Sequence, residues 1–321
     1  MPGERIHLVF RLLAAATVVA AFAQVTLGGI VRVTGSGLGC PDWPLCHGRI
    51  IPPFEYSVLI EYSHRLFASS LGALMLGLLV LTWVYFRSNR LLLISTVVGS
   101  LMIVIAAILG GITVLTELSW WVRLLHLGIA QVVVASAVVV AIVSWKYIKP
   151  NYGVLAEYRS MKGSGAFKYW VISGVIGTFL LILFGSYIVG IGAGTSCSTW
   201  PLCRGAIFPG GEMYTLHMIH RYIALIVGVI LLMISVVAKF NLSEQSGIVR
   251  VSFLSNVIML AQVLFGAVMI WAEFPSYLKA MHLSMATLLW ISLILLATLV
   301  YMASPGRFQE EGRSCTDGVR C

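Results

Sequence analysis

Charged residues are scarce in this chain of 321 residues. They make up 10% of the sequence, whereas a typical soluble domain has about 25%. Acidic residues are the rarer kind, with 12 Asp and Glu against 21 Lys and Arg, while hydrophobic residues reach 59%. This composition excludes an ordinary soluble domain. The net charge of +9 does not indicate nucleic acid as a partner, because in a membrane protein basic residues set the orientation.

Long apolar runs are what the sequence has instead. Eight of them are long enough to cross the hydrocarbon layer of a bilayer, which is about 30 Å thick. We therefore predict an all-α integral membrane protein of the cell membrane, with eight transmembrane helices in contact with the lipid bilayer. The predicted spans lie near 10–31, 62–86, 91–115, 121–145, 169–191, 215–238, 249–272 and 278–302.

Basic residues are distributed unequally between the two sides of these spans. Fourteen Lys and Arg lie on the side of both termini and seven on the other side. Because cytoplasmic loops carry the excess of basic residues, we expect both termini in the cytoplasm. The two cysteine-containing loops are then expected on the outer side.

The sequence also repeats itself at an offset of 156 or 157 residues. Each half contains four predicted spans, so both halves are expected to insert in the same sense, as parallel repeats about an axis along the membrane normal. The matching features are CPDWPLCHG at 40–48 with CSTWPLCRG at 197–205, His64-Arg65 with His220-Arg221, His126 with His282, and Glu117 with Glu273.

The repeat predicts two four-helix bundles related by a pseudo-twofold axis. The first is expected over residues 1–145 and the second over 169–303. A cytoplasmic linker at 146–168 separates them, and residues 304–321 are expected to form a flexible cytoplasmic tail, in which Cys315 and Cys321 are reduced thiols.

Four histidines at repeat-related positions are the main candidates for chemistry. His64, His126, His220 and His282 lie near the starts of the even-numbered spans. A histidine inside a membrane is costly and is a functional candidate by default. Two imidazoles facing each other across a four-helix bundle can bind one heme iron. The alternative is a hydrogen bond to a neighbouring helix, and zinc is disfavoured because no cysteine accompanies these histidines in the membrane.

Small residues precede each histidine near the same end of the preceding odd-numbered span. The glycines are Gly28, Gly110, Gly185 and Gly266. They could allow a flat macrocycle to approach the backbone, or could equally serve close helix packing.

Glu61 distinguishes the first half from the second. It lies three residues before His64, on the same helix face, and its repeat equivalent is His217. A carboxyl beside a heme is suited to proton transfer. The alternative is an interfacial glutamate favoured by the helix dipole.

Arginines directly follow two of the histidines. Arg65 and Arg221 could pair with heme propionates, or could extend to the membrane interface.

The outer cysteines form two closely spaced pairs, Cys40 with Cys46 and Cys197 with Cys203. An extracytoplasmic location permits disulfides. A redox role for the first pair stays open, because exposed, strained disulfides are the labile ones. Structural bracing is the expectation for the second pair.

Taken together, these features resemble the bacterial heme A synthase family. The resemblance covers residues 8–302. It rests on Glu61-Tyr62-Ser63-His64-Arg65, His126, His220-Arg221, His282, the two Trp-Pro-Leu-Cys loops, and GGIVRVTGSGLGCPDWPLC at 28–46.

The resemblance implies an oxidoreductase that converts a ring methyl of heme O to a formyl group through hydroxylated intermediates, giving heme A for terminal oxidases. It implies that His64 and His126 face the substrate heme O, with Glu61 catalytic. It further implies that His220 and His282 ligate a cofactor heme b. The implied partners are heme O synthase (a farnesyltransferase), the terminal oxidase assembly and an unidentified electron acceptor or donor.

Three other functions fit parts of the pattern. A di-heme b-type electron-transfer protein, such as a quinol oxidoreductase module, would use the same histidines but gives Glu61 no necessary role. A transporter would suit the parallel repeat, although no span has a clear midplane break. A thiol oxidoreductase would use the outer cysteines.

Overall fold

Eight long α-helices make up most of the part of the chain that the structure describes. The computed structural model describes residues 2–147 and 165–303. All eight helices are long and apolar enough to cross a membrane, which confirms the predicted all-α membrane class. The elements are α1 (Pro2–Val33), α2 (Tyr56–Tyr85), α3 (Arg90–Leu115), α4 (Trp120–Tyr147), α6 (Gly165–Gly190), the short 3-10 helix η1 (Ala193–Thr195), α7 (Glu212–Asn241), α8 (Ser246–Trp271) and α9 (Ser276–Met302).

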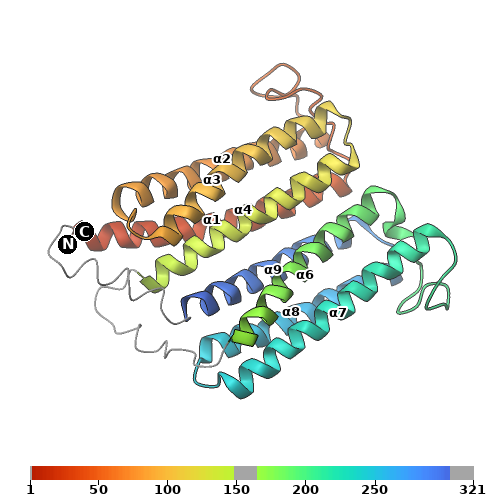
Figure 1. Ribbon diagram of the computed structural model, residues 1–321. Helices are drawn as coiled ribbons and strands as arrows, with labels where there is room; N and C mark the ends of the chain where they lie inside the picture. Colours follow the sequence, from red (N-terminus) through yellow and green to blue (C-terminus); the bar gives the residue numbers. More distant parts are fainter. Residues whose placement is uncertain (1, 148–164, 304–321) are drawn as a thin grey trace.

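The helices are arranged as two groups of four (Figure 1). Within the first group α1 contacts α2 and α4, and α3 contacts the same two helices; the second group, α6 to α9, repeats this pattern. The second and fourth helices of each group are therefore diagonal neighbours across a ring. Most of the predicted linker and all of the predicted tail, with Cys315 and Cys321, lie outside the described residues.

The two groups meet along a seam made by α1, α4, α6 and α9. At the seam the Gln131 Nε2 donates to Thr287 Oγ1 at 3.2 Å, and these two residues are 156 positions apart, as the repeat requires. The buried Trp290 Nε1 donates to the Gln131 carbonyl at 2.8 Å, and the hydroxyls of Thr26 and Ser284 lie 2.9 Å apart. Polar side chains thus join the halves inside an otherwise apolar contact.

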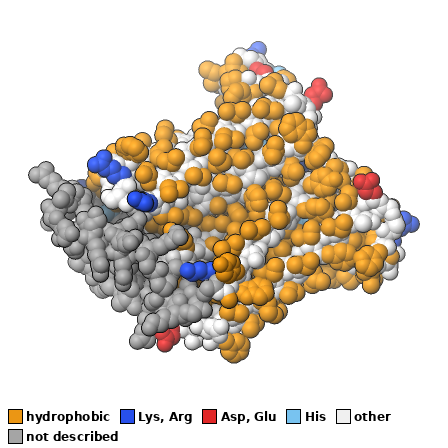
Figure 2. All heavy atoms as spheres, viewed as in Figure 1, with side chains coloured by type: hydrophobic (Ala, Val, Ile, Leu, Met, Phe, Trp, Pro, Cys, Tyr) orange, Lys and Arg blue, Asp and Glu red, His pale blue; other side chains and the backbone are white. Residues whose placement is uncertain are grey.

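The outer surface of the helices is apolar. Figure 2 shows hydrophobic side chains over the lengths of the helices, with charged groups near their ends. Large exposed side chains such as Val19, Leu225 and Phe253 lie on this surface. A surface of this kind suits contact with lipid, where the helices satisfy their own backbone hydrogen bonds.

The turns reproduce the internal repeat in detail. Glu117 and Leu118, after α3, have positive φ values of 50° and 64°, and Glu273 and Phe274, after α8, have 60° and 60°. Two consecutive non-glycine residues in this conformation are uncommon. Their occurrence at both equivalent turns supports the sequence repeat independently of the motifs.

Several helices begin before the predicted spans, the first of them α1, which begins at Pro2 rather than near 10. Helix α2 begins at Tyr56 rather than near 62, and α7 at Glu212 rather than near 215. Their first turns lie beneath the cysteine loops and not in lipid, so an apolar run does not mark their starts. Packing is tight there, because a Cβ on Gly39 would lie 2.6 Å from the Ser57 carbonyl oxygen.

The seam hydrogen bond of Trp290 can be tested by substitution. Trp290→Phe leaves the buried Gln131 carbonyl without this donor, and we expect a loss of about 1 kcal/mol of unfolding free energy. The measurement is thermal unfolding in detergent. Trp83→Phe, on the exposed surface of α2, is the matched control and should leave the midpoint unchanged; an equal shift for both variants would contradict the seam interpretation.

Candidate functional site

A cavity of about 630 Å³ lies within the first helix group. Helices α1 to α4 and the loop after α1 form its wall, and Ser186 and Leu283 reach it from the second group. His64, His126 and Glu61 all line it. The structure therefore brings together the three residues that the sequence predicted for the first half, with the histidines on diagonal helices. The volume is within the range of small-molecule and cofactor sites.

Each of the four histidine rings lies against the glycine that precedes it in the repeat. A Cβ added at the glycine would lie 3.1 Å from Cε1 of His64, 3.5 Å from that of His126, 3.0 Å from that of His220 and 3.3 Å from that of His282. The glycines thus make room for imidazole rings. A Cβ would be crowded by the ring at three of the four glycines and in ordinary contact at Gly110. The approach of a macrocycle to these glycines stays a prediction.

The histidines have nitrogen atoms that the protein leaves unused. Nδ1 of His126, His220 and His282 is buried without a hydrogen-bond partner among the described residues. Buried polar atoms are normally satisfied. Neutral imidazole nitrogens are also the usual axial ligands of heme iron. The donor set therefore fits a heme in each half.

A glutamine accompanies one histidine in each half. The Gln24 side-chain nitrogen lies 3.0 Å from His64 Nδ1 and donates to the His64 carbonyl at 3.2 Å. The Gln262 nitrogen lies 3.2 Å from His282 Nε2 and donates to the His282 carbonyl at 3.0 Å. Sequence reasoning missed both glutamines. Their signal was available, since each is a polar residue inside an apolar helix, four positions before a repeat glycine.

Glu61 is buried and both of its carboxylate oxygens are engaged. Oε2 accepts the Cys40 N–H at 2.8 Å, and Oε1 lies 2.5 Å from the Arg65 guanidinium. The side chain therefore connects three things: the cavity, the first cysteine loop and a neighbouring arginine.

Arg65 is directed toward the first cysteine loop. Its Nη1 donates to the carbonyls of Asp42 and Leu45 at 2.7 and 2.8 Å, and its Nη2 to that of Cys40 at 3.1 Å. The guanidinium also lines the cavity. Its main contacts are thus structural, and a contact between Arg65 and a propionate stays a prediction.

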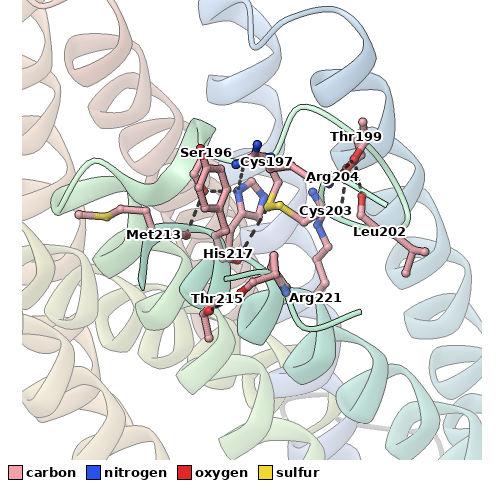
Figure 3. The surroundings of a disulfide bond; sticks show 12 residues. Ser196, Cys197, Thr199, Leu202, Cys203, Arg204, Met213, Thr215, His217 and Arg221 are labelled. Carbon is pink, nitrogen blue, oxygen red and sulfur yellow. Dashed lines mark hydrogen bonds between the residues drawn. A yellow bond between two sulfur atoms is a disulfide. The ribbon is translucent and has the colours of Figure 1, made fainter. Parts of the chain in front are cut away.

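The second cysteine loop is built in the same way (Figure 3). Arg221 Nη1 donates to the carbonyls of Thr199 and Pro201 at 2.9 and 2.8 Å, while its Nη2 is buried without a partner among the described residues. The predicted disulfides, Cys40–Cys46 and Cys197–Cys203, are both present. Each loop thus forms a small braced cap over its helix group.

Glu61 and His217 perform the same structural task in the two halves. The Cys40 N–H donates to Glu61 Oε2 at 2.8 Å, and the Cys197 N–H donates to His217 Nδ1 at 3.4 Å. An acceptor at this position is therefore required by both loops. Only the first half uses a carboxylate for it, so the loop alone does not explain the choice of glutamate.

The first cysteine loop contains a further carboxylate that the second lacks. Asp42 accepts the N–H groups of His47 and Gly48 at 2.6 and 2.7 Å. The Gly48 N–H, and then that of His47, hold the pKa of the exposed Asp42 carboxyl below its ordinary value. The repeat equivalent is Thr199, whose hydroxyl accepts the Arg204 N–H at 2.9 Å.

Acid should therefore loosen the first loop and spare the second. Because the folded-state pKa of Asp42 is lowered, its ionised form stabilises the loop above the unfolded pKa, and this stabilisation is lost as the pH falls through the lowered pKa. Fluorotryptophan resonances at Trp43 and Trp200 report the two loops by fluorine NMR. We expect only the Trp43 signal to shift in acid, and Asp42→Thr should abolish the shift; a persisting shift in that variant would exclude Asp42 as its cause.

The described residues contain no cluster of three or more His, Cys, Asp or Glu side chains able to hold a metal ion. Pairs of imidazoles on diagonal helices remain the arrangement that the structure offers.

Comparison with known proteins places this architecture in a family. The family model described as COX15-CtaA, cytochrome oxidase assembly protein, matches residues 11–57 and 53–294. A heme A synthase of Alkalihalophilus pseudofirmus is 28% identical over 279 residues, which cover 86% of this chain and 90% of that protein. A heme A synthase of Geobacillus thermodenitrificans is 27% identical over 312 residues, covering 94% and 95%. The chain belongs to the COX15-CtaA family of cytochrome oxidase assembly proteins.

Proposed function

We propose that this protein is a heme A synthase that oxidises a ring methyl of heme O to a formyl group. The relatives described above carry that enzyme's name. One structural observation carries the proposal: the cavity of the first half contains two histidines and a buried carboxylate, and the carboxylate is replaced by histidine in the second half. An otherwise repeated molecule thus differs at an ionisable group beside a heme-sized space.

In the first half the residues would hold and orient the substrate. His64 and His126 line the cavity from diagonal helices and would face the iron of heme O from opposite sides. Glu61 would accept a proton released at the oxidised ring edge, and the engaged Arg65 would stabilise its charged form. The cysteine loop would limit the access of water, because Trp43 and Pro44 line the cavity at that end.

In the second half His220 and His282 would ligate heme b. When bound, heme b supplies a one-electron redox centre. The protein's part is to hold the two imidazoles in place, and Gln262 would do so for His282 through the ring and its carbonyl. The reaction also requires a source of the formyl oxygen, either water with an external electron acceptor or dioxygen with an external electron donor. The supply of heme O implies a farnesyltransferase upstream, and the use of heme A implies terminal oxidases downstream.

The orientation proposed for the membrane follows from the charges. The excess of Lys and Arg on the side of the termini would place that side in the cytoplasm. The disulfide loops would then lie outside, where the oxidising environment maintains them.

A di-heme b-type electron-transfer protein is less well supported than the synthase. It would use the same cavity for a second heme but would need no carboxylate at Glu61. Purified protein incubated with heme O and a redox partner separates the two, because chromatography and mass analysis of extracted hemes detect hydroxylated and formyl products. An extract that contains only heme b and unchanged heme O would favour the carrier.

Substitution of Glu61 tests its proposed catalytic part. Glu61→His places the second half's residue in the first half, so the acceptor for the Cys40 N–H can be retained while the carboxylate is lost. We expect conversion to fall about 100-fold or more, as for loss of a general acid–base group, with heme b content unchanged. Chromatography of extracted hemes measures the conversion, and absorbance spectroscopy measures the heme b content. Loss of heme b with normal conversion would reverse the assignment of the halves.

Substitution of the second-half histidines tests the cofactor assignment. His220→Ala or His282→Ala removes one axial ligand, and we expect most of the purified protein's heme b to be lost. His64→Ala is the matched control from the first half, and should weaken heme O binding while heme b remains. The pyridine hemochrome assay measures the heme b content of each purified variant. Equal loss of heme b in all three variants would contradict the assignment of heme b to the second half.

A further inference from the structure

Two arginines of the first half, Arg32 and Arg123, have no role in the function proposed above. Both line the large cavity, and both also line a small adjoining cavity with Ser186 and Gly190 of the second group. Arg32 lies in the last turn of α1 and Arg123 in the first turn of α4. The two guanidinium groups therefore meet at one corner of the site, at the end where the cysteine loops lie (the loop end).

Among residues 2–147 and 165–303, neither guanidinium has a counter-charge. The ion pair between Arg65 and Glu61 is the one that the described residues form, so no described carboxylate lies within 4 Å of Arg32 or Arg123. Arg123 Nε is buried with no hydrogen-bond partner there. Both arginines are half-buried. Withdrawing a charge from water without a partner is costly, and two like charges that line one cavity increase the cost.

The helix dipoles make Arg123 the harder residue to explain. Arg32 is at the carboxyl end of α1, where a cation is favoured, but Arg123 is at the amino end of α4, where an anion is favoured instead. An anion bound between the two arginines would account for both the missing counter-charge and the unfavourable position.

The positions of the arginines relative to the histidines indicate what the anion belongs to. Arg123 is three residues from His126, on the same face of α4, and Arg32 is four residues from Gly28, which contacts His64. In both cases the arginine is displaced toward the loop end, by about 4.5 and 6 Å along the helix axis. The backbone positions of both arginines thus lie about one turn beyond the level of His126 and Gly28.

The second half lacks this arrangement. The repeat equivalent of Arg32 is Val189, and that of Arg123 is Lys279. The double arginine is therefore specific to the half that contains the cavity and Glu61, as expected of residues that select a substrate and not of residues that maintain the fold.

We propose that Arg32 and Arg123 form a carboxylate-binding site that anchors the propionate groups of the porphyrin substrate at the loop end of the cavity. The identity of the ligand rests on the function proposed above. Arginine pairs with carboxylates through two parallel hydrogen bonds, and the apolar remainder of the cavity suits the macrocycle. The opposite edge of the porphyrin, with its apolar substituent, then points toward the middle of the membrane.

The test compares heme O with its dimethyl ester, whose propionates carry no charge. Each is titrated into purified full-length protein, with its resident heme bound, and the dissociation constant is measured from the absorbance change. The variants are Arg32→Val, which introduces the second half's residue, and Arg123→Gln. Arg49→Gln is the matched control, because Arg49 is exposed on the first cysteine loop and does not line the cavity.

We expect each cavity variant to weaken heme O binding roughly tenfold, the size of one charge-assisted hydrogen bond, and to leave ester binding within about twofold of the wild type. Retained resident heme shows that a variant is folded. Equal binding of acid and ester by the wild type, or equal weakening of both by the variants, would overturn the proposal. So would an anionic phospholipid found by native mass spectrometry on the wild type and lost from the variants without any acid–ester difference.

The same samples separate this inference from the proposed function. Arginine-dependent binding of heme O without formation of hydroxylated or formyl products would contradict the synthase and leave the carboxylate site intact. If products form but the wild type binds the acid and the ester equally well, the synthase is supported and the carboxylate site is contradicted.

Discussion

The histidine rings lie inside membrane-spanning helices, where a polar atom without a partner is costly because no water can replace the missing hydrogen bond. The protein meets this constraint incompletely. Gln24 lies within hydrogen-bond distance of His64 in the first half, and Gln262 of His282 in the second. Nδ1 of His126, His220 and His282 nevertheless has no hydrogen-bond partner among the described residues. These unpaired atoms are what a bound heme would account for, and the glycines beside the rings and the capping loops lie around them.

The repeat explains how four histidines are placed in the same way by a small set of structural elements. A hairpin of two helices supplies a glycine near the end of one helix and a histidine near the start of the next. Two hairpins make a ring in which the histidines are diagonal, and two rings join through seam contacts such as that between Gln131 and Thr287. The cysteine loops then close the same end of each ring, each held by an arginine that follows a histidine.

Much of this could be predicted because it depends on local pattern. The eight spans follow from apolar runs, and the disulfides from the spacing of Cys40 with Cys46 and its repeat. Helices α2 and α7 begin before the predicted apolar spans, because their first turns pack under a loop and are not marked by an apolar run. The structural contacts of Arg65, and the meeting of Arg32 with Arg123, depend on tertiary placement: residues 91 positions apart in sequence reach one cavity corner, which periodicity cannot indicate.

The differences between the halves are more informative than the likeness. At the loop end Glu61, Arg32 and Asp42 stand where the second half has His217, Val189 and Thr199. Glu61 and Arg32 line the cavity, and Asp42 orders the loop that closes it. If each half holds a heme through its two histidines, the binding itself requires no such differences. Their concentration around one space is what is expected if one half came to act on its porphyrin while the other kept the porphyrin as a fixed component.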